Sequence, residues 1–153
     1  MTLEIPQDLL AEIQTHGEAA YPEEGAGLLL GNLDGERMRV SALFKLANRR
    51  EASARRNRYA LAPDDYLQGE AEAARLGLDL IGVFHSHPDH PDRPSEFDRE
   101  WAWPTFAYVI TSVHMGRAIS SRAWRLQEDR SSFQEEPIAS PVPGSRRKAQ
   151  PQG

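Results

Sequence analysis

Two histidines separated by one residue, with a serine and an aspartate shortly downstream, form the segment of this chain whose residue types could do chemistry. The string reads His85-Ser86-His87, then seven residues, Ser95, two residues and Asp98. Residues two apart on an extended backbone point to the same side, so both imidazoles could face one metal ion. With the Asp98 carboxylate they would leave a fourth tetrahedral position for water, which is the open arrangement of a catalytic zinc.

Each part of this string also has an ordinary structural explanation. A pair of histidines at the end of a strand can simply be solvated, and Ser95 followed three residues later by Asp98 has the pattern of a helix cap. A capping hydroxyl could still donate its own proton to a substrate oxygen. From the composition of the chain, the full string arises by chance in about one sequence in ten thousand, so we interpret it as functional.

The elements that must position these residues can be predicted from hydrophobic periodicity. Helices are expected at 6–20 and 63–76, with a third, short helix that Ser95 caps and that ends near Trp101. Strands are expected at 25–31, 37–46, 78–84, 106–112, 118–126 and 133–136. The histidines would then lie at the end of the strand 78–84, in a proline-stiffened loop 85–94. Interleaved strands and helices predict an α/β fold of the α+β type, with one mixed sheet and flanking helices.

Length and composition place the chain among ordinary globular proteins. Its 153 residues are 39% hydrophobic and 27% charged, which is typical of one domain, expected here at 1–136. Residues 137–153 hold four prolines and no acid, so we expect a disordered basic tail. No run approaches the roughly 18 apolar residues of a membrane span, and no signal-peptide pattern begins the chain, so the expected location is the cytoplasm.

Charge and cysteine content exclude further classes of function. The formal net charge is −5, and the first 136 residues alone carry 15 basic against 23 acidic groups. Such an acidic body is a poor nucleic-acid binder. The absence of cysteine excludes disulfides, a thiol nucleophile and any cysteine-based metal site. An arginine-rich stretch, 49–58, is interpreted as a solvated loop that could contact an acidic partner.

Together with an upstream glutamate, the string resembles the signature of the JAMM (MPN+) zinc metalloproteases, in particular their small stand-alone bacterial members. Pro22-Glu23-Glu24-Gly25-Ala26-Gly27, followed by an apolar run, is similar to the segment in which the family carries its glutamate. The approach to the histidines, Ile81-Gly82-Val83-Phe84, and the segment 101–110 resemble the family as well. The resemblance covers about residues 5–136. It implies a JAMM/MPN-like mixed sheet, partly barrel-like, with helices around it and a cytidine-deaminase-like architecture.

The resemblance also implies roles for five residues. Zinc would be held by His85, His87 and Asp98. Glu24 would be the general base that takes a proton from the zinc-bound water and returns it to the leaving amine. Ser95 would hydrogen-bond the developing oxyanion. Glu23 is adjacent to Glu24, and because neighbours on a strand face opposite sides, only one of the two can face the metal; the family spacing favours Glu24.

The substrate that the resemblance implies is a ubiquitin-like β-grasp protein, such as a sulfur carrier, whose C-terminal Gly-Gly is joined to another group through an amide or isopeptide bond. Two alternatives remain open at this stage. A zinc hydrolase of small peptides or amides would use the same metal and base. A non-catalytic MPN scaffold would bind partners only, although such scaffolds typically lose ligands that this chain retains. The sequence predicts neither the carrier nor the oligomeric state.

Overall fold

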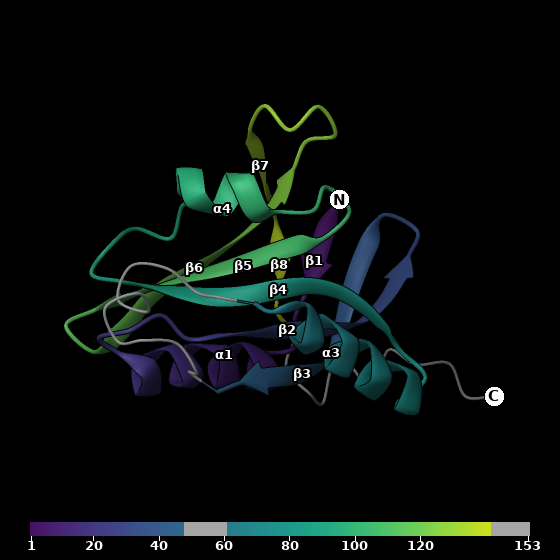
Figure 1. Cartoon of the computed structure of the whole chain (residues 1–153), viewed down its shortest axis with the longest axis horizontal. Coiled ribbons are helices and arrows are strands. Elements are labelled where there is room, and N and C mark those ends of the chain that lie inside the picture. Colours follow the sequence, from purple (N-terminus) through teal and green to yellow (C-terminus); the bar gives the residue numbers. More distant parts are fainter. Residues whose placement is uncertain (48–60, 142–153) are drawn as a thin grey trace.

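The computed structural model describes residues 1–47 and 61–141, which form one mixed eight-stranded sheet with helices around it (Figure 1). Its strand order is β7-β6-β5-β4-β2-β3-β1-β8. The strands are β1 Thr2–Glu4, β2 Ala26–Asp34, β3 Arg37–Leu46, β4 Asp79–Pro88, β5 Ala107–His114, β6 Arg117–Leu126, β7 Phe133–Glu136 and β8 Ile138–Ala139. The sheet is nearly closed, which confirms the predicted fold class. The predicted loop at 49–58 lies outside the described residues.

The three described helices lie where the sequence predicts them. They are α1 Gln7–Ala20, α3 Pro63–Arg75 and α4 Glu96–Trp101. In Figure 1, α1 and α4 appear on opposite sides of the strands β4, β5 and β6. Pro63 suits the first turn of α3 because its missing N–H would have no helical partner there.

Side chains alternate between the two faces of the sheet, and each face carries its own apolar cluster. Leu29 and Phe84 pack in a cluster with Ile13 of α1. Leu28 and Val83, their neighbours in sequence, pack in a second cluster with Ala73 of α3. This alternation follows from the period of two along a strand. Over 83–88 it therefore assigns odd-numbered residues of β4 to the face of α3 and even-numbered residues to the face of α1. A register shift just before this segment reverses the assignment, so that Ile81 packs in the cluster of α1.

Strand β4 continues further than the sequence predicts. The apolar run ends at Phe84, but β4 extends through His85, Ser86 and His87 to Pro88. Its partner β5 runs parallel, with His85 opposite Ile110 and His87 opposite Ser112. The prediction of a loop at 85–94 is therefore wrong for residues 85–88, which are part of the strand. Its basis is the end of the apolar run, and polar residues that face a buried site lack apolar periodicity even where the backbone remains in the sheet.

The predicted domain boundary at Glu136 is also displaced by the structure. Strand β8 pairs in parallel with β1, and Leu3 and Ile5 donate backbone hydrogen bonds to the carbonyls of Pro137 and Ala139. Residues 137–141 thus cover the outer edge of β1 and belong to the fold. The rest of the predicted tail, 142–153, lies outside the described residues.

Across the described parts of the chain, no helix combines the length and the apolar character needed to cross a membrane. The cytoplasmic location stays a prediction.

Candidate metal centre

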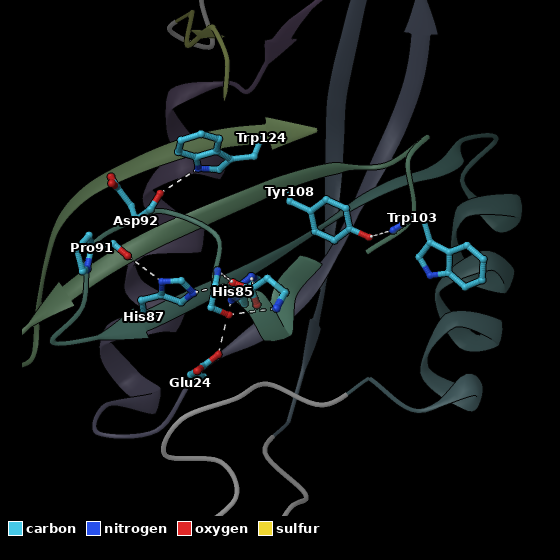
Figure 2. Close-up of polar contacts among 10 residues, drawn as sticks. Glu24, His85, His87, Pro91, Asp92, Trp103, Tyr108 and Trp124 are labelled. Carbon is cyan, nitrogen blue, oxygen red and sulfur yellow. Dashed lines mark hydrogen bonds and ion pairs between the residues drawn. The ribbon is translucent and has the colours of Figure 1, made fainter. Parts of the chain in front are cut away.

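Two side chains from β4 and one from α4 converge on one point. His85, His87 and Asp98 each offer a ligand atom, and these atoms all lie within 4.8 Å of one another. The distance from His85 Nε2 to Asp98 Oδ1 is 3.6 Å, and that from His87 Nε2 to Asp98 Oδ2 is 3.2 Å. All three residues are buried. The structure thus brings together the three residues that the sequence predicts as ligands. Figure 2 shows His85 and His87 side by side, with Glu24 next to them.

The alternation along β4 explains how both histidines reach this point. His85 and His87 continue the odd-numbered face that carries Val83, whereas Ser86 lies against α1, where a Cβ atom on Gly17 would come within 3.0 Å of the Ser86 Cβ. The two imidazole rings are 5.0 Å apart between centroids. Their position is therefore set by the strand itself and not by a loop.

Asp98 reaches the site because it is the third residue of α4. Ser95 Oγ accepts a hydrogen bond from the Asp98 amide at 3.1 Å, and Asp98 Oδ2 accepts one from the Ser95 amide at 2.8 Å. This reciprocal capping box, anticipated as a structural explanation of the string, fixes the rotamer of the carboxylate. The carboxylate that completes the capping box is thus the same one that faces the two histidines.

The far end of α4 is held from β5 and from the turn that follows β6. Arg130 donates to the carbonyls of Arg99, Glu100 and Ala102, and so caps the C-terminal end of the helix. Tyr108 Oη accepts a hydrogen bond from the Trp103 amide at 2.7 Å (Figure 2). A helix of only six residues would otherwise be marginal, so these contacts matter for the position of Asp98.

The second ring nitrogen of His87 has a partner that defines its chemistry. Nδ1 lies 2.8 Å from the carbonyl oxygen of Pro91, which can only accept, so Nδ1 carries a proton and Nε2 is the atom left for a metal. Burial disfavours the charged ring, but the hydrogen bond and charge of Asp98 outweigh burial and hold the pKa of His87 above its usual value.

The same contacts act on Asp98 in the opposite direction. Burial raises its pKa, but the two imidazoles and the Ser95 amide outweigh burial and place the pKa of Asp98 well below its ordinary range. The carboxylate is therefore ionised at neutral pH, as a ligand must be.

Glu24 lies just before β2, on the same side of the sheet as the histidines. It is buried, and its Oε1 lies 3.6 Å from His85 Nδ1. That oxygen accepts no hydrogen bond from any of the described residues. Glu23 is only partly buried, so between the two candidate glutamates the geometry favours Glu24.

Ser86 holds the segment that carries Glu24. Its Oγ accepts a hydrogen bond from the Gly25 amide at 2.8 Å, and its own amide donates to the Gly25 carbonyl at 3.0 Å. The side chain is almost completely buried. The residue between the two histidines is therefore a brace for the backbone next to Glu24, as its orientation on the strand suggests.

A cleft of about 390 Å³ opens over these groups. It is lined by Glu24, His87, Pro88, His90, Pro91, Arg93 and Ser95. Ser95 is exposed in the cleft, and because its oxygen accepts from the Asp98 amide, its proton remains available to a substrate. The cleft thus presents an acceptor, Glu24, and a hydroxyl donor, Ser95, beside the histidine and aspartate ligand set.

Asp92, in the loop that follows β4, is buried although it is an acidic residue in a polar segment. Its Oδ1 lies 3.4 Å from Arg122 Nε, and its carbonyl accepts a hydrogen bond from Trp124 Nε1 at 2.9 Å. His90, in contrast, is exposed. Sequence reasoning misses Arg122 and Trp124, since nothing local in β6 indicates a contact with a residue some 30 positions earlier.

Comparison with known proteins agrees with this geometry. The sequence model of the family described as "Prokaryotic homologs of the JAB domain" matches residues 6–127. A desampylase from Haloferax volcanii is 35% identical over 92 residues, which are 60% of this chain and 63% of that protein. The match therefore spans less than two thirds of that relative.

Two further proteins are similar over more of the chain. A probable TtuB-protein conjugate cleaving protease from Thermus thermophilus is 32% identical over 77% of this chain and 75% of its own length. The solution structure of a protein from Salinibacter ruber has a TM-score of 0.72 and 48% identity, and covers 94% of this chain and 93% of that one. The family match covers most of the described fold and all five site residues, so this chain belongs to the prokaryotic homologues of the JAB domain.

Proposed function

We propose that this protein is a zinc-dependent isopeptidase that hydrolyses the amide bond after the C-terminal Gly-Gly of a ubiquitin-like β-grasp protein. The observation that carries this proposal is the convergence of His85, His87 and Asp98 on one point, with the Glu24 carboxylate beside them at the base of a cleft. The names of the two curated relatives, a desampylase and a probable conjugate cleaving protease, support the reaction class.

The ligand set fits zinc. With bond lengths of about 2.0–2.1 Å, two ligand atoms in a tetrahedral zinc site lie about 3.3 Å apart. The two separations between imidazole nitrogens and Asp98 oxygens, 3.6 and 3.2 Å, bracket this value. Two imidazoles and one carboxylate are also donors that zinc accepts in catalytic sites. In this proposal His85, His87 and Asp98 hold the metal.

Each remaining residue then has a defined task. Zinc supplies a Lewis acid that lowers the pKa of a coordinated water towards 7. Glu24 takes a proton from the attacking water and delivers it to the leaving amine, and its buried Oε1, which accepts no hydrogen bond within the described chain, is suited to receive that proton. The Ser95 hydroxyl donates to the oxyanion that develops on the scissile carbonyl.

A glycine tail suits the site for a steric reason. The lining of the cleft includes the rings of Pro88 and Pro91, and two glycines reach its base without side chains that would collide with these rings. The body of the carrier would remain outside.

The test of this proposal is the Glu24→Gln variant. Glutamine is nearly isosteric but cannot accept or pass on the proton, so we expect full zinc content, an unchanged melting temperature and a loss of turnover of about 10²- to 10⁴-fold. The measurement is steady-state cleavage of a carrier protein extended beyond its Gly-Gly, together with metal analysis.

Glu23→Gln is the matched control, because it makes the same change one residue away on a side chain that lies outside the cleft lining. We expect it to behave like the wild type. Full activity of Glu24→Gln would refute the assignment of the base. A wild-type protein that binds zinc and cleaves small amides but no Gly-Gly carrier would instead refute the substrate.

A further inference from the structure

In the loop that follows β4, each of the residues 89–92 has a backbone group hydrogen-bonded to a residue of the sheet. The Asp89 amide donates to the Val113 carbonyl at 2.7 Å, Ser112 Oγ donates to the His90 carbonyl at 2.7 Å, and Trp124 Nε1 donates to the Asp92 carbonyl at 2.9 Å. Between the carbonyls of His90 and Asp92 lies that of Pro91, which accepts a hydrogen bond from His87 Nδ1 (Figure 2).

These contacts bear on His87 in a specific way. The peptide carbonyls on both sides of Pro91 are fixed by side chains from β5 and β6, so the Pro91 carbonyl has little freedom to turn away from the ring. A ring whose Nδ1 donates to a fixed carbonyl is held in one tautomer and one orientation, with Nε2 directed at Asp98 Oδ2.

Strand geometry explains why Ser112 and Trp124 can reach the carbonyls on either side of Pro91. Ser112 is the register partner of His87 on the parallel strand β5, so the two side chains share a face of the sheet. Trp124 and Arg122 are two apart on β6 and also share a face, and they hold Asp92 by its carbonyl and its carboxylate respectively. A buried carboxylate of this kind is stabilised by its pairing with Arg122.

We propose that Trp124 and Ser112 are positioning residues of the metal centre, which act through the Pro91 carbonyl to hold His87 in the tautomer and orientation that a metal requires. This inference rests on the proposed function, because it concerns the same zinc site. It goes beyond the assignment of the ligands, because it predicts that zinc affinity depends on two side chains that do not contact the metal.

The experiment compares zinc affinity in Trp124→Phe and Ser112→Ala with that of the wild type, by competition with a chelating dye. Trp124→Phe keeps an aromatic ring and loses the N–H, while Ser112→Ala removes one hydroxyl. Direct partners of a ligand, such as the Pro91 carbonyl, typically contribute about 10- to 100-fold to metal affinity. Because these variants loosen that carbonyl without removing it, we expect each to bind zinc about tenfold more weakly, at the lower end of this range. A second readout is the His87 Nδ1 proton by ¹⁵N NMR of the zinc-free protein, which should be protected in the wild type and exchange with water in both variants.

Thr111→Val is the matched control. Thr111 precedes Ser112, is equally buried, and has its hydroxyl 2.7 Å from Ser121 Oγ on the opposite face. It should lose stability without losing zinc affinity, and its His87 proton should stay protected.

The outcomes separate this inference from the proposed function. If the wild type binds zinc and cleaves a carrier, but both variants bind zinc within threefold of it and keep the His87 proton protected, the positioning role is wrong and the proposed function stands. A wild type without zinc refutes the proposed function. If Trp124→Phe fails to fold, Ser112→Ala decides the question alone.

Discussion

Buried backbone amides next to the metal centre depend on single side chains for their hydrogen bonds. The clearest case is the Gly25 amide, which donates to Ser86 Oγ. In Ser86→Ala this amide would remain buried without an acceptor, so we expect a loss of about 1–3 kcal/mol in the free energy of unfolding, measured by urea denaturation. Turnover should fall as well, because the segment that carries Glu24 loses its brace.

Ser120→Ala serves as the control for this substitution. Ser120 is exposed on β6, so the same chemical change should leave both the free energy of unfolding and turnover close to wild type. Equal stability of the two variants would show that the Gly25 amide finds another acceptor.

The functional residues were predictable where their signal is local. His85 and His87 are two residues apart, so on a strand their side chains share a face. Ser95 and Asp98 are three residues apart, which is the spacing of a capping box at the start of a helix. Trp124 and Arg130 have no such signal, because their partners lie 28–32 residues away and are set by the packing of β6 against the loop and α4.

At the scale of elements, the last described strand covers the edge of the sheet. Truncation after Glu136 removes β8 and the carbonyls that accept from Leu3 and Ile5. We expect this truncation to lower the melting temperature by several degrees, since each lost hydrogen bond contributes about 1 kcal/mol and the edge of β1 becomes exposed. Thermal unfolding followed by circular dichroism is the measurement.

Truncation after Pro141 is the matched comparison. It keeps every described contact of β8, so the melting temperature and turnover should equal those of the full chain. If the chain that ends at Glu136 melts at the same temperature as the chain that ends at Pro141, β8 contributes nothing to the stability of the sheet.

Helix α1 is tied to β2 by a histidine that should make stability depend on pH. His16 Nε2 lies 3.0 Å from the Ala26 carbonyl, and burial lowers the pKa of His16 despite this contact. The unfolded chain therefore binds a proton more readily, so the free energy of unfolding falls as the pH drops through 6.5 towards the folded pKa. His16→Gln keeps a donor for the carbonyl and removes the titration.

The measurement for this prediction is urea denaturation of both proteins between about pH 7.5 and 5.5, the range over which this linkage acts. The wild type should lose more stability than His16→Gln as the pH falls. Parallel curves would contradict the prediction, and would mean that His16 takes up its proton equally in the folded and unfolded chains.

Element prediction succeeded for the longer segments and failed at short or polar ones. Helix 6–20 and strand 37–46 have clear apolar periods and appear within one residue of their expected bounds. Strands β1 and β8 have three and two residues, too few for any period to be read. The sequence does not predict the polar end of β4 as a strand, because residues that face a candidate metal site are polar and therefore have the composition of a loop.

At the scale of the whole molecule, the proposed metal ligands come from two separate elements, β4 and α4, which a bound zinc would join. Binding to the folded state alone stabilises a protein by about 4 kcal/mol at a ligand concentration 1,000 times the dissociation constant. Removal of zinc with a chelator should therefore lower the melting temperature clearly, and added zinc should restore it. Scanning calorimetry of the two forms tests this.

The control for this prediction is Asp98→Asn, which keeps an oxygen for the cap but removes the ligand charge. Its melting temperature should respond little to zinc or chelator. A wild-type melting temperature that is insensitive to chelator would mean that no tightly bound metal joins β4 to α4.

The alternation along β4 has a consequence for which length changes this chain can tolerate. Insertion or deletion of one residue between Gly82 and His85 would turn both imidazoles towards α1 and aim Ser86 at Asp98, whatever the chemistry of the added residue. A two-residue change would restore the side but move the rings about 7 Å along the strand, away from α4. Length variation among natural or designed relatives should therefore avoid this strand and accumulate in the loops.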